Sequence, residues 1–94
     1  MPTVVHGDFE WDEDKAASNF AKHGVMFDEA ALAMRDSFSL DFDDLVQPDR
    51  LVTLAASPAG RILYIVSTES GDRIRIISAR EATRHERRLY EEGE

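Results

Sequence analysis

The sequence predicts an α+β fold, because three segments with helical features are distributed among six short segments with the features of β-strands. Its 94 residues suit one domain with one core, which we assign to residues 1–94. Hydrophobic residues make up 43% of the chain and charged residues 32%, the balance of a globular protein. The predicted order is β-β-α-α-β-β-β-β-α, with the helices packed on one side of an antiparallel sheet.

Two short strands and a helix are expected at the start of the chain. Thr3–His6 is a short strand candidate, and the alternation of apolar and polar residues predicts a strand at Phe9–Trp11. Asp12 is placed to cap a first helix that ends near His23, and Gly24 suits a left-handed C-cap. The polar stripe predicted for this helix consists of Asp12, Lys15, Asn19 and Lys22. Its apolar stripe is predicted to be Ala16, Ala17, Phe20 and Ala21.

A second helix is expected from an N-cap at Asp28 to about Arg35. The next segment alternates strictly, which predicts a strand with Phe38, Leu40 and Phe42 on one face. The acidic residues that follow, with Pro48, indicate a loop.

The second half has the pattern of a meander that ends in a helix. Strands are predicted at Leu51–Ser57, Ile62–Thr68 and Arg73–Ala79, and the second is apolar on both faces, as a central strand would be. Thr83 and the Glu three residues later form a capping box for a last helix that ends near Glu92. Strict alternation in the third strand predicts one face with Arg73, Arg75, Ile77 and Ala79. The other face would carry Ile74, Ile76, Ser78 and Arg80.

The charge of the chain is unevenly distributed. The net charge is −8, but residues 1–49 carry −9 and residues 50–94 carry +1. Residues 73–88 contain six arginines and two glutamates, a local net of +4. The total argues against a protein that coats nucleic acid or membranes, whereas the local excess is typical of an anion-binding face. A solvated surface paired with the acidic half explains the same arginines.

Several kinds of site are not expected. There is no cysteine, so disulfides and thiolate zinc sites are excluded, and no histidine follows His85 by four residues. We expect no metal and no cofactor. No long apolar run and no signal-peptide pattern occur, so we expect a cytoplasmic protein with no membrane partner.

The remaining polar residues suit RNA cleavage by attack of a 2′-hydroxyl on the adjacent phosphate without a metal. Such a reaction needs a base, an acid and cationic donors to the phosphorane. His23 and His85 are both candidates for proton transfer. Phosphate-binding candidates are Arg80, Arg84 and Lys22. Trp11 and Tyr90 are candidates for base stacking. Structural roles compete with these, since Arg80 can pair with Glu86 and Trp11 can be a core residue.

The two ends of the chain resemble the BrnT family. The opening residues that carry the resemblance are Phe9-Glu10-Trp11-Asp12, Lys15, Asn19, Lys22-His23-Gly24-Val25, Phe27 and Glu29. The closing residues are Arg73-Ile74-Arg75-Ile76-Ile77-Ser78-Ala79-Arg80, Ala82, Thr83, Glu86 and Tyr90. The resemblance implies a RelE-like fold and an mRNA-cleaving toxin of a type II toxin–antitoxin pair. It also implies a BrnA-type antitoxin, which neutralises the toxin, dimerises and represses the operon, so that DNA is contacted only through the antitoxin.

Together the motifs and the chemistry predict a set of site residues. The catalytic candidates are Lys22, His23, Arg80, Glu86 and Tyr90. The substrate-binding candidates are Trp11, Lys15, Arg73, Arg75 and Arg84. The alternative function is a non-catalytic module whose arginine face docks an acidic antitoxin segment, so that it acts only within the regulatory complex.

Overall fold

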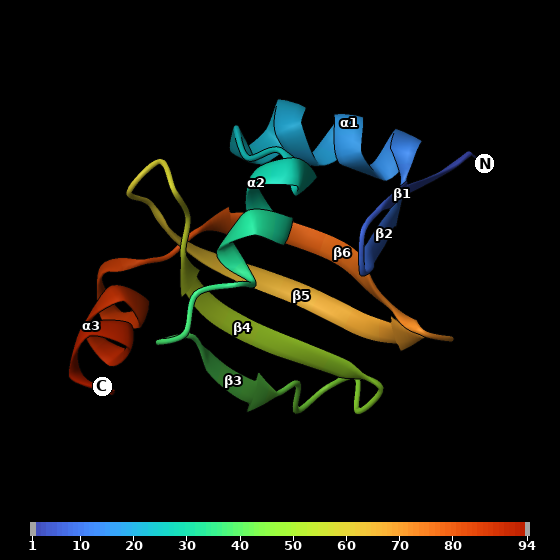
Figure 1. Cartoon of the computed structure of the whole chain (residues 1–94). Coiled ribbons are helices and arrows are strands. Elements are labelled where there is room, and N and C mark those ends of the chain that lie inside the picture. Colours follow the sequence, from blue (N-terminus) through green and yellow to red (C-terminus); the bar gives the residue numbers. More distant parts are fainter. Residues whose placement is uncertain (1, 94) are drawn as a thin grey trace.

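The computed structural model describes residues 2–93, which form a six-stranded sheet and three helices (Figure 1). The predicted element order is confirmed. The strands are β1 Thr3–His6, β2 Phe9–Asp12, β3 Leu40–Asp43, β4 Arg50–Ala56, β5 Ile62–Ser70 and β6 Arg73–Glu81. The helices are α1 Glu13–His23, α2 Phe27–Ala33 and α3 Arg84–Glu92. None of the helices within residues 2–93 is long and apolar enough to cross a bilayer.

The strands lie in the order β1-β2-β6-β5-β4-β3. Four of the neighbouring pairs are antiparallel, as predicted, but β2 pairs parallel to β6 through Phe9–Ile74 and Glu10–Arg75. The sheet is therefore mixed. The long connection from β2 to β6, which contains two helices and three strands, explains this pairing, because a parallel pair needs a crossover rather than a hairpin.

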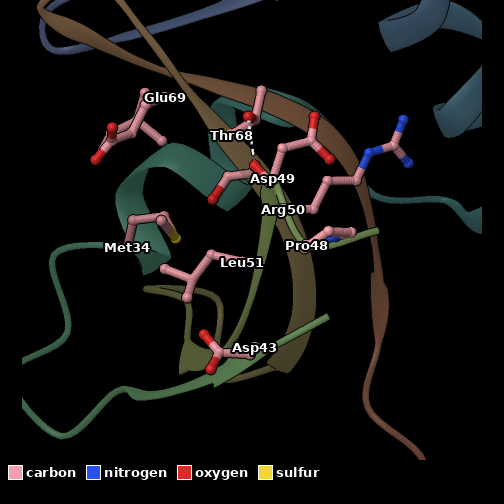
Figure 2. Close-up of a pocket in the computed structure, with 10 residues that line it drawn as sticks. Met34, Asp43, Pro48, Asp49, Arg50, Leu51, Thr68 and Glu69 are labelled. Carbon is pink, nitrogen blue, oxygen red and sulfur yellow. Dashed lines mark hydrogen bonds between the residues drawn. The ribbon is translucent and has the colours of Figure 1, made fainter. Parts of the chain in front are cut away.

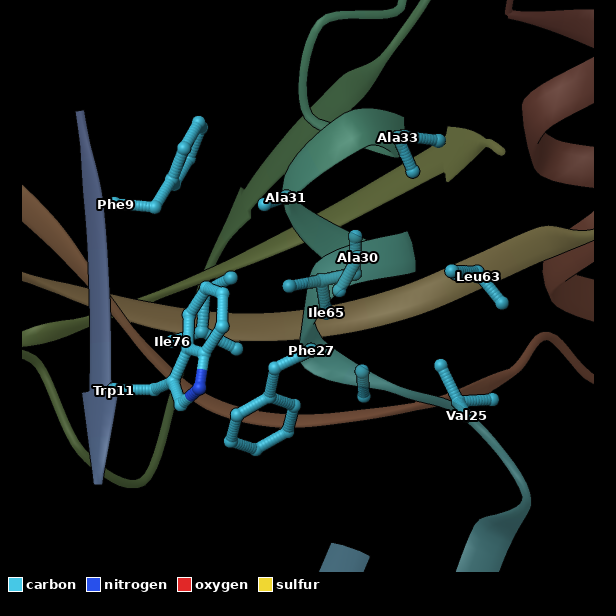
Figure 3. Close-up of a cluster of buried hydrophobic side chains, with 12 residues drawn as sticks. Phe9, Trp11, Val25, Phe27, Ala30, Ala31, Ala33, Leu63, Ile65 and Ile76 are labelled. Atoms are coloured by element: carbon cyan, nitrogen blue, oxygen red, sulfur yellow. The ribbon is translucent and has the colours of Figure 1, made fainter. Parts of the chain in front are cut away.

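Helices α1 and α2 cover one face of the sheet and enclose the core (Figure 1). Figure 3 shows Trp11 of β2 beside Phe27 of α2, with their ring centroids 6.0 Å apart and the rings nearly perpendicular. Leu63 and Ile65 of β5 complete the buried layer. Each such side chain contributes about 2 kcal/mol by leaving water.

The predicted stripes of α1 are wrong. Asn19 is buried and Phe20 is 52% exposed, so the helix presents a polar residue to the sheet. The amide of Asn19 donates to the carbonyls of Val25 and Ala79 and accepts from the Ala79 N–H. Because β2 pairs with only two residues of β6, the backbone of Ala79 has no strand neighbour on that side, and Asn19 takes its place.

A β-bulge in β6 changes which side chains share a face. Ser78 pairs with Val66 and Ile76 pairs with Ser67, so Ile77 is an extra residue without a partner on β5. The alternation shifts by one residue at this point. Arg73 and Arg75 therefore lie on the same face as Arg80, opposite the core face that carries Ile76 and Ala79, and the predicted separation of these arginines is wrong.

Two predicted boundaries differ from the structure. Helix α2 begins after Met26, which makes no side-chain cap, and it ends at Ala33, two residues before the expected end. Strand β3 begins at Leu40, because Phe38 lies in a turn in which its N–H donates to Asp36 Oδ1 at 3.0 Å. The left-handed Gly24 and the Thr83 capping box are confirmed.

Helix α3 lies against the opposite face of the sheet, near the end where Arg80 lies, so the prediction that the helices pack on one side is wrong for α3. Its last turn is attached through the Tyr90 hydroxyl, which donates to Asp36, and Asp36 also accepts from the Ala56 N–H at 2.9 Å. Burial alone would raise the pKa of Asp36, but the hydrogen bonds from Tyr90, Ala56 and Phe38 lower it overall. Asp36 is therefore a charged anchor for α3.

Candidate functional site

The sheet face opposite α1 and α2, which we call the open face, carries the site candidates on β4, β5 and β6. Pairing register and alternation assign to it Arg50, Val52, Leu54, Tyr64, Val66, Thr68, Arg73, Arg75, Ser78 and Arg80. Helix α3 lies across one end of this face, so that Glu86 and Leu89 border the same surface as Tyr64. The open face therefore combines arginines with apolar side chains.

Arg80 is fixed in place by three neighbours. Its guanidinium carbon lies 4.0 Å from the centroid of the Tyr64 ring, a cation–π contact. Nη1 and Nη2 donate to the two carboxylate oxygens of Glu86 at 2.8 and 3.0 Å, and Nη1 also donates to the Glu81 carbonyl at 3.1 Å. The Glu86 carboxylate raises the pKa of Arg80, and Arg80 lowers the pKa of Glu86, so both groups are charged.

Arg80 retains hydrogen-bonding capacity despite these contacts. A guanidinium has five N–H groups in a rigid plane. Three of them donate to Glu86 and Glu81, whereas Nε–H and the second Nη2–H donate to no group within residues 2–93. These two N–H groups lie on the same edge of the guanidinium, which matches two oxygens of a phosphate.

Arg61 provides a contrast. It donates through Nε and Nη2 to Glu29, at 3.0 and 2.5 Å, and through Nη2 to the Gly24 carbonyl at 3.1 Å. Its Nε/Nη2 edge is therefore occupied. This arginine attaches the turn between α1 and α2 to the β4–β5 loop, and its role is structural.

A groove of about 400 Å³ lies beside Arg80, between α3 and the β3 side of the open face. Its apolar lining consists of Phe42, Leu45, Val52, Leu54, Tyr64 and Leu89. Its polar lining consists of Asp43, Asp44, His85 and Glu86. His85 and Glu86 therefore line the same groove.

The other arginines of the open face differ in their partners. Arg75 donates to Glu10 at 2.5 Å, and Ser70 donates to the same carboxylate at 3.1 Å. The hydrogen bond from Arg75 lowers the pKa of Glu10. Arg73 and, at the start of α3, Arg84 are exposed and make no ion pair within residues 2–93.

The structure separates the remaining predicted residues from Arg80. Lys15, Lys22 and His23 lie on α1, in the layer on the opposite face of the sheet, and none bonds to Arg80 or Glu86 within residues 2–93. Trp11 is 3% exposed, and its ring lies against His6 and Phe27. Tyr90 is buried. Neither aromatic ring is available to a ligand in this conformation.

Tyr64 belongs to this site, although we did not predict it from the sequence. Its contact with Arg80 depends on the pairing of the two residues across β5 and β6. The available signal is weak: one aromatic residue stands in an otherwise aliphatic stretch of strand.

A second depression, of about 540 Å³, lies on the sheet face that α1 and α2 cover, and Met34, just after α2, lines it (Figure 2). It is lined by three carboxylates, those of Asp43, Asp49 and Glu69, and the Arg50 guanidinium points away from Asp43 and Glu69 (Figure 2). Thr68 donates to the Asp49 carbonyl at 2.7 Å. One arginine, Arg50, lines this depression, whereas Arg73, Arg75 and Arg80 lie on the open face, so the open face is the better candidate for an anionic ligand.

Comparisons with known proteins relate the chain to a protein family and to a solved structure. The sequence model described as "Ribonuclease toxin, BrnT, of type II toxin-antitoxin system" matches residues 11–86. The structure is similar to the crystal structure of the Brucella abortus ribonuclease toxin BrnT, with a TM-score of 0.65 and 26% sequence identity. That match covers 79% of this chain and 94% of the Brucella chain. No curated protein sequence matches the chain.

Proposed function

The chain belongs to the BrnT family of ribonuclease toxins of type II toxin–antitoxin systems, and we propose that it cleaves RNA on its open face, at Arg80. The reaction is attack of a ribose 2′-oxygen on the adjacent phosphorus, with loss of the 5′-oxygen of the next nucleotide. The products are a 2′,3′-cyclic phosphate and a 5′-hydroxyl. The groups that we propose for this reaction are side chains of the protein, and the proposed mechanism uses no metal ion.

The observation that carries this proposal is the unoccupied edge of Arg80. Nε–H and one Nη2–H can donate to two phosphate oxygens at once, while Glu86 and the Tyr64 ring hold the guanidinium. Negative charge on these oxygens increases in the phosphorane, so a fixed bidentate donor stabilises the transition state more than the substrate. Arg80 is thus the proposed catalytic cation, and Glu86 positions it.

We assign proton transfer to His85. It lines the groove next to Glu86, whereas His23 lies on α1, on the opposite face. The His85 imidazole would take the proton from the 2′-oxygen, and the leaving 5′-oxygen would take a proton from solvent water. Lys22 and Tyr90, which the sequence offered for the same reaction, are assigned other roles: Lys22 lies on α1, and Tyr90 donates to Asp36 to attach α3.

The proposed partner is a BrnA-type antitoxin that blocks the open face, with DNA contacted only through the antitoxin. We expect the toxin to act in the cytoplasm, because its RNA substrate is there. A purely regulatory role remains the second candidate. It is favoured by Arg73, which is exposed on the open face and makes no ion pair within residues 2–93, so that it can bind a carboxylate of an acidic antitoxin segment.

Expression of the chain alone, with growth and RNA integrity as readouts, separates these candidates. The wild type should arrest growth and fragment RNA. Arg80→Ala should lower the cleavage rate about 100-fold, the usual effect of losing one transition-state donor. Arg35→Ala is the matched control, since Arg35 is exposed after α2 and makes no ion pair within residues 2–93. Intact RNA at verified expression of folded wild type would favour the regulatory role.

A further inference from the structure

We propose that the open-face groove binds one unstacked nucleobase of the RNA, and that Asp44 makes it prefer a base with an exocyclic amino group. This inference rests on the proposed ribonuclease function, because it assigns a specificity site next to the proposed catalytic arginine. It also gives a role to acidic residues that a ribonuclease does not otherwise need.

The lining of the groove suits a base rather than a phosphate. Phe42 is 41% exposed and offers an aromatic surface on the open face. Leu89 and Leu54 supply apolar walls, and the volume of about 400 Å³ is within the range of small-ligand sites. Proteins that read single-stranded RNA bind splayed-out bases in this way, on aromatic and apolar side chains.

The groove is continuous with the proposed phosphate site. Tyr64 and Glu86 both line it, and these are the two side chains that hold the Arg80 guanidinium. A phosphate on the free edge of Arg80 therefore lies beside the groove. The base of an adjoining nucleotide is the part of the substrate that reaches it.

Asp44 is a fixed acceptor within this lining. Its Oδ1 accepts the N–H groups of Val46 and Gln47 at 2.9 and 3.0 Å, which immobilises the carboxylate in a turn. The hydrogen bonds from Gln47 and Val46 lower the pKa of Asp44, so the group is charged. Oδ2 accepts from no group within residues 2–93. A carboxylate oxygen accepts from the exocyclic amino group of cytosine, whereas uracil has at the same position a keto oxygen, which the carboxylate repels.

The same charges argue against the other occupant that fits an apolar groove, an acidic segment of the antitoxin. Asp43 and Asp44 both line the groove, and they would repel the carboxylates of such a segment. A base carries no negative charge, and its amino group is a donor. The combination of an apolar floor with a carboxylate acceptor therefore favours a nucleobase.

Binding of non-cleavable RNA tests this subsite without depending on catalysis. We would titrate the full chain with 2′-O-methyl hexamers of cytidine and of uridine, which differ in the base alone, and measure fluorescence anisotropy at fixed salt. The wild type should bind the cytidine hexamer about tenfold more tightly. Asp44→Asn keeps an Oδ1 acceptor for the turn but presents an amide donor, and it should abolish or reverse the preference. Phe42→Ala should weaken binding of both hexamers about tenfold.

The matched controls are Asp28→Asn and Phe20→Ala, both exposed on the helix side of the sheet. They should leave both affinities unchanged. Equal binding of the two hexamers by the wild type, no binding of either, or an unchanged preference in Asp44→Asn would overturn the subsite. A parallel assay with unmodified RNA reports the ribonuclease function separately: cleavage that depends on Arg80 without a base preference leaves that function standing and removes only the subsite.

Discussion

The Glu86 carboxylate both caps helix α3 and holds Arg80. A variant that affects one of these roles more than the other can therefore separate the effect on catalysis from the effect on stability. Oε1 accepts from the Thr83 N–H at 2.9 Å in the capping box, and both oxygens accept from Arg80. Glu86→Gln keeps an acceptor for the cap but places an amide N–H group against a guanidinium donor. We expect the cleavage rate to fall at least tenfold, because Arg80 loses its fixed orientation.

The control for this prediction is Thr83→Ala, which removes the N-cap hydroxyl that accepts from the Glu86 N–H at 3.2 Å. It should cost about 1 kcal/mol of unfolding free energy. The partly exposed Arg80–Glu86 pair is worth a similar amount. Kinetics and urea unfolding on both variants would distinguish the roles. Equal loss of activity in the two variants would mean that Glu86 matters only through the stability of α3.

At the scale of residues, the sequence offered the pairing of Arg80 with Glu86 as one of two alternatives, because both partners belong to neighbouring segments of the chain. It did not predict Tyr64, whose contact with Arg80 depends on strand register. It offered Trp11 and Tyr90 as ligand contacts, yet both are buried. Composition favours aromatic rings in cores and in RNA sites alike, so only the packing decides between them.

At the scale of elements, Asn19 attaches α1 to the uncovered part of β6. Its side chain makes three hydrogen bonds to the backbone of Val25 and Ala79, all of them buried. Asn19→Ala leaves those backbone groups without partners, so we expect the free energy of unfolding to fall by about 3 kcal/mol. Chemical denaturation measures this directly. Ser18→Ala, at the exposed neighbouring position, should change it by less than about 0.5 kcal/mol.

A loss below about 1 kcal/mol in Asn19→Ala would show that water or a shifted backbone replaces the amide at little cost. The same residue explains why the predicted stripes of α1 were wrong. Amphipathic patterning assigns polar residues to the solvent side, and it cannot detect a sheet edge that needs a donor and an acceptor from a helix. The bulge at Ile77 likewise made the predicted faces of β6 wrong. One extra residue in the strand moves the side chains on the N-terminal side of the bulge to the opposite face from the one that strict alternation predicts.

At the scale of the whole molecule, local signals predicted the order of elements well. Asp12, Gly24 and Thr83 mark helix ends through their own hydrogen bonds or backbone angles, so the structure confirms them. The parallel pairing of β2 with β6 and the position of α3 depend on contacts between distant segments. The location of the candidate site follows from those contacts, and for this reason the sequence supplied Arg80 and Glu86 but placed them with Lys22 and His23.

The distribution of charge over the molecule predicts how steeply the affinity for RNA falls with salt concentration. The chain carries a net charge of −8, and its positive groups on the open face are few. Arg75 is neutralised by Glu10, which leaves Arg50, Arg73 and the free edge of Arg80 for phosphates. With about three phosphate contacts to single-stranded RNA, the logarithm of affinity should fall with the logarithm of salt concentration with a slope near −2.

Anisotropy titrations of a 2′-O-methyl RNA between about 50 and 300 mM salt would measure this slope. Arg73→Ala should reduce the slope by about 0.7, and Arg35→Ala should not change it. A slope steeper than about −5 would require more cations than the open face holds, and it would move the RNA path toward the exposed arginines of α3.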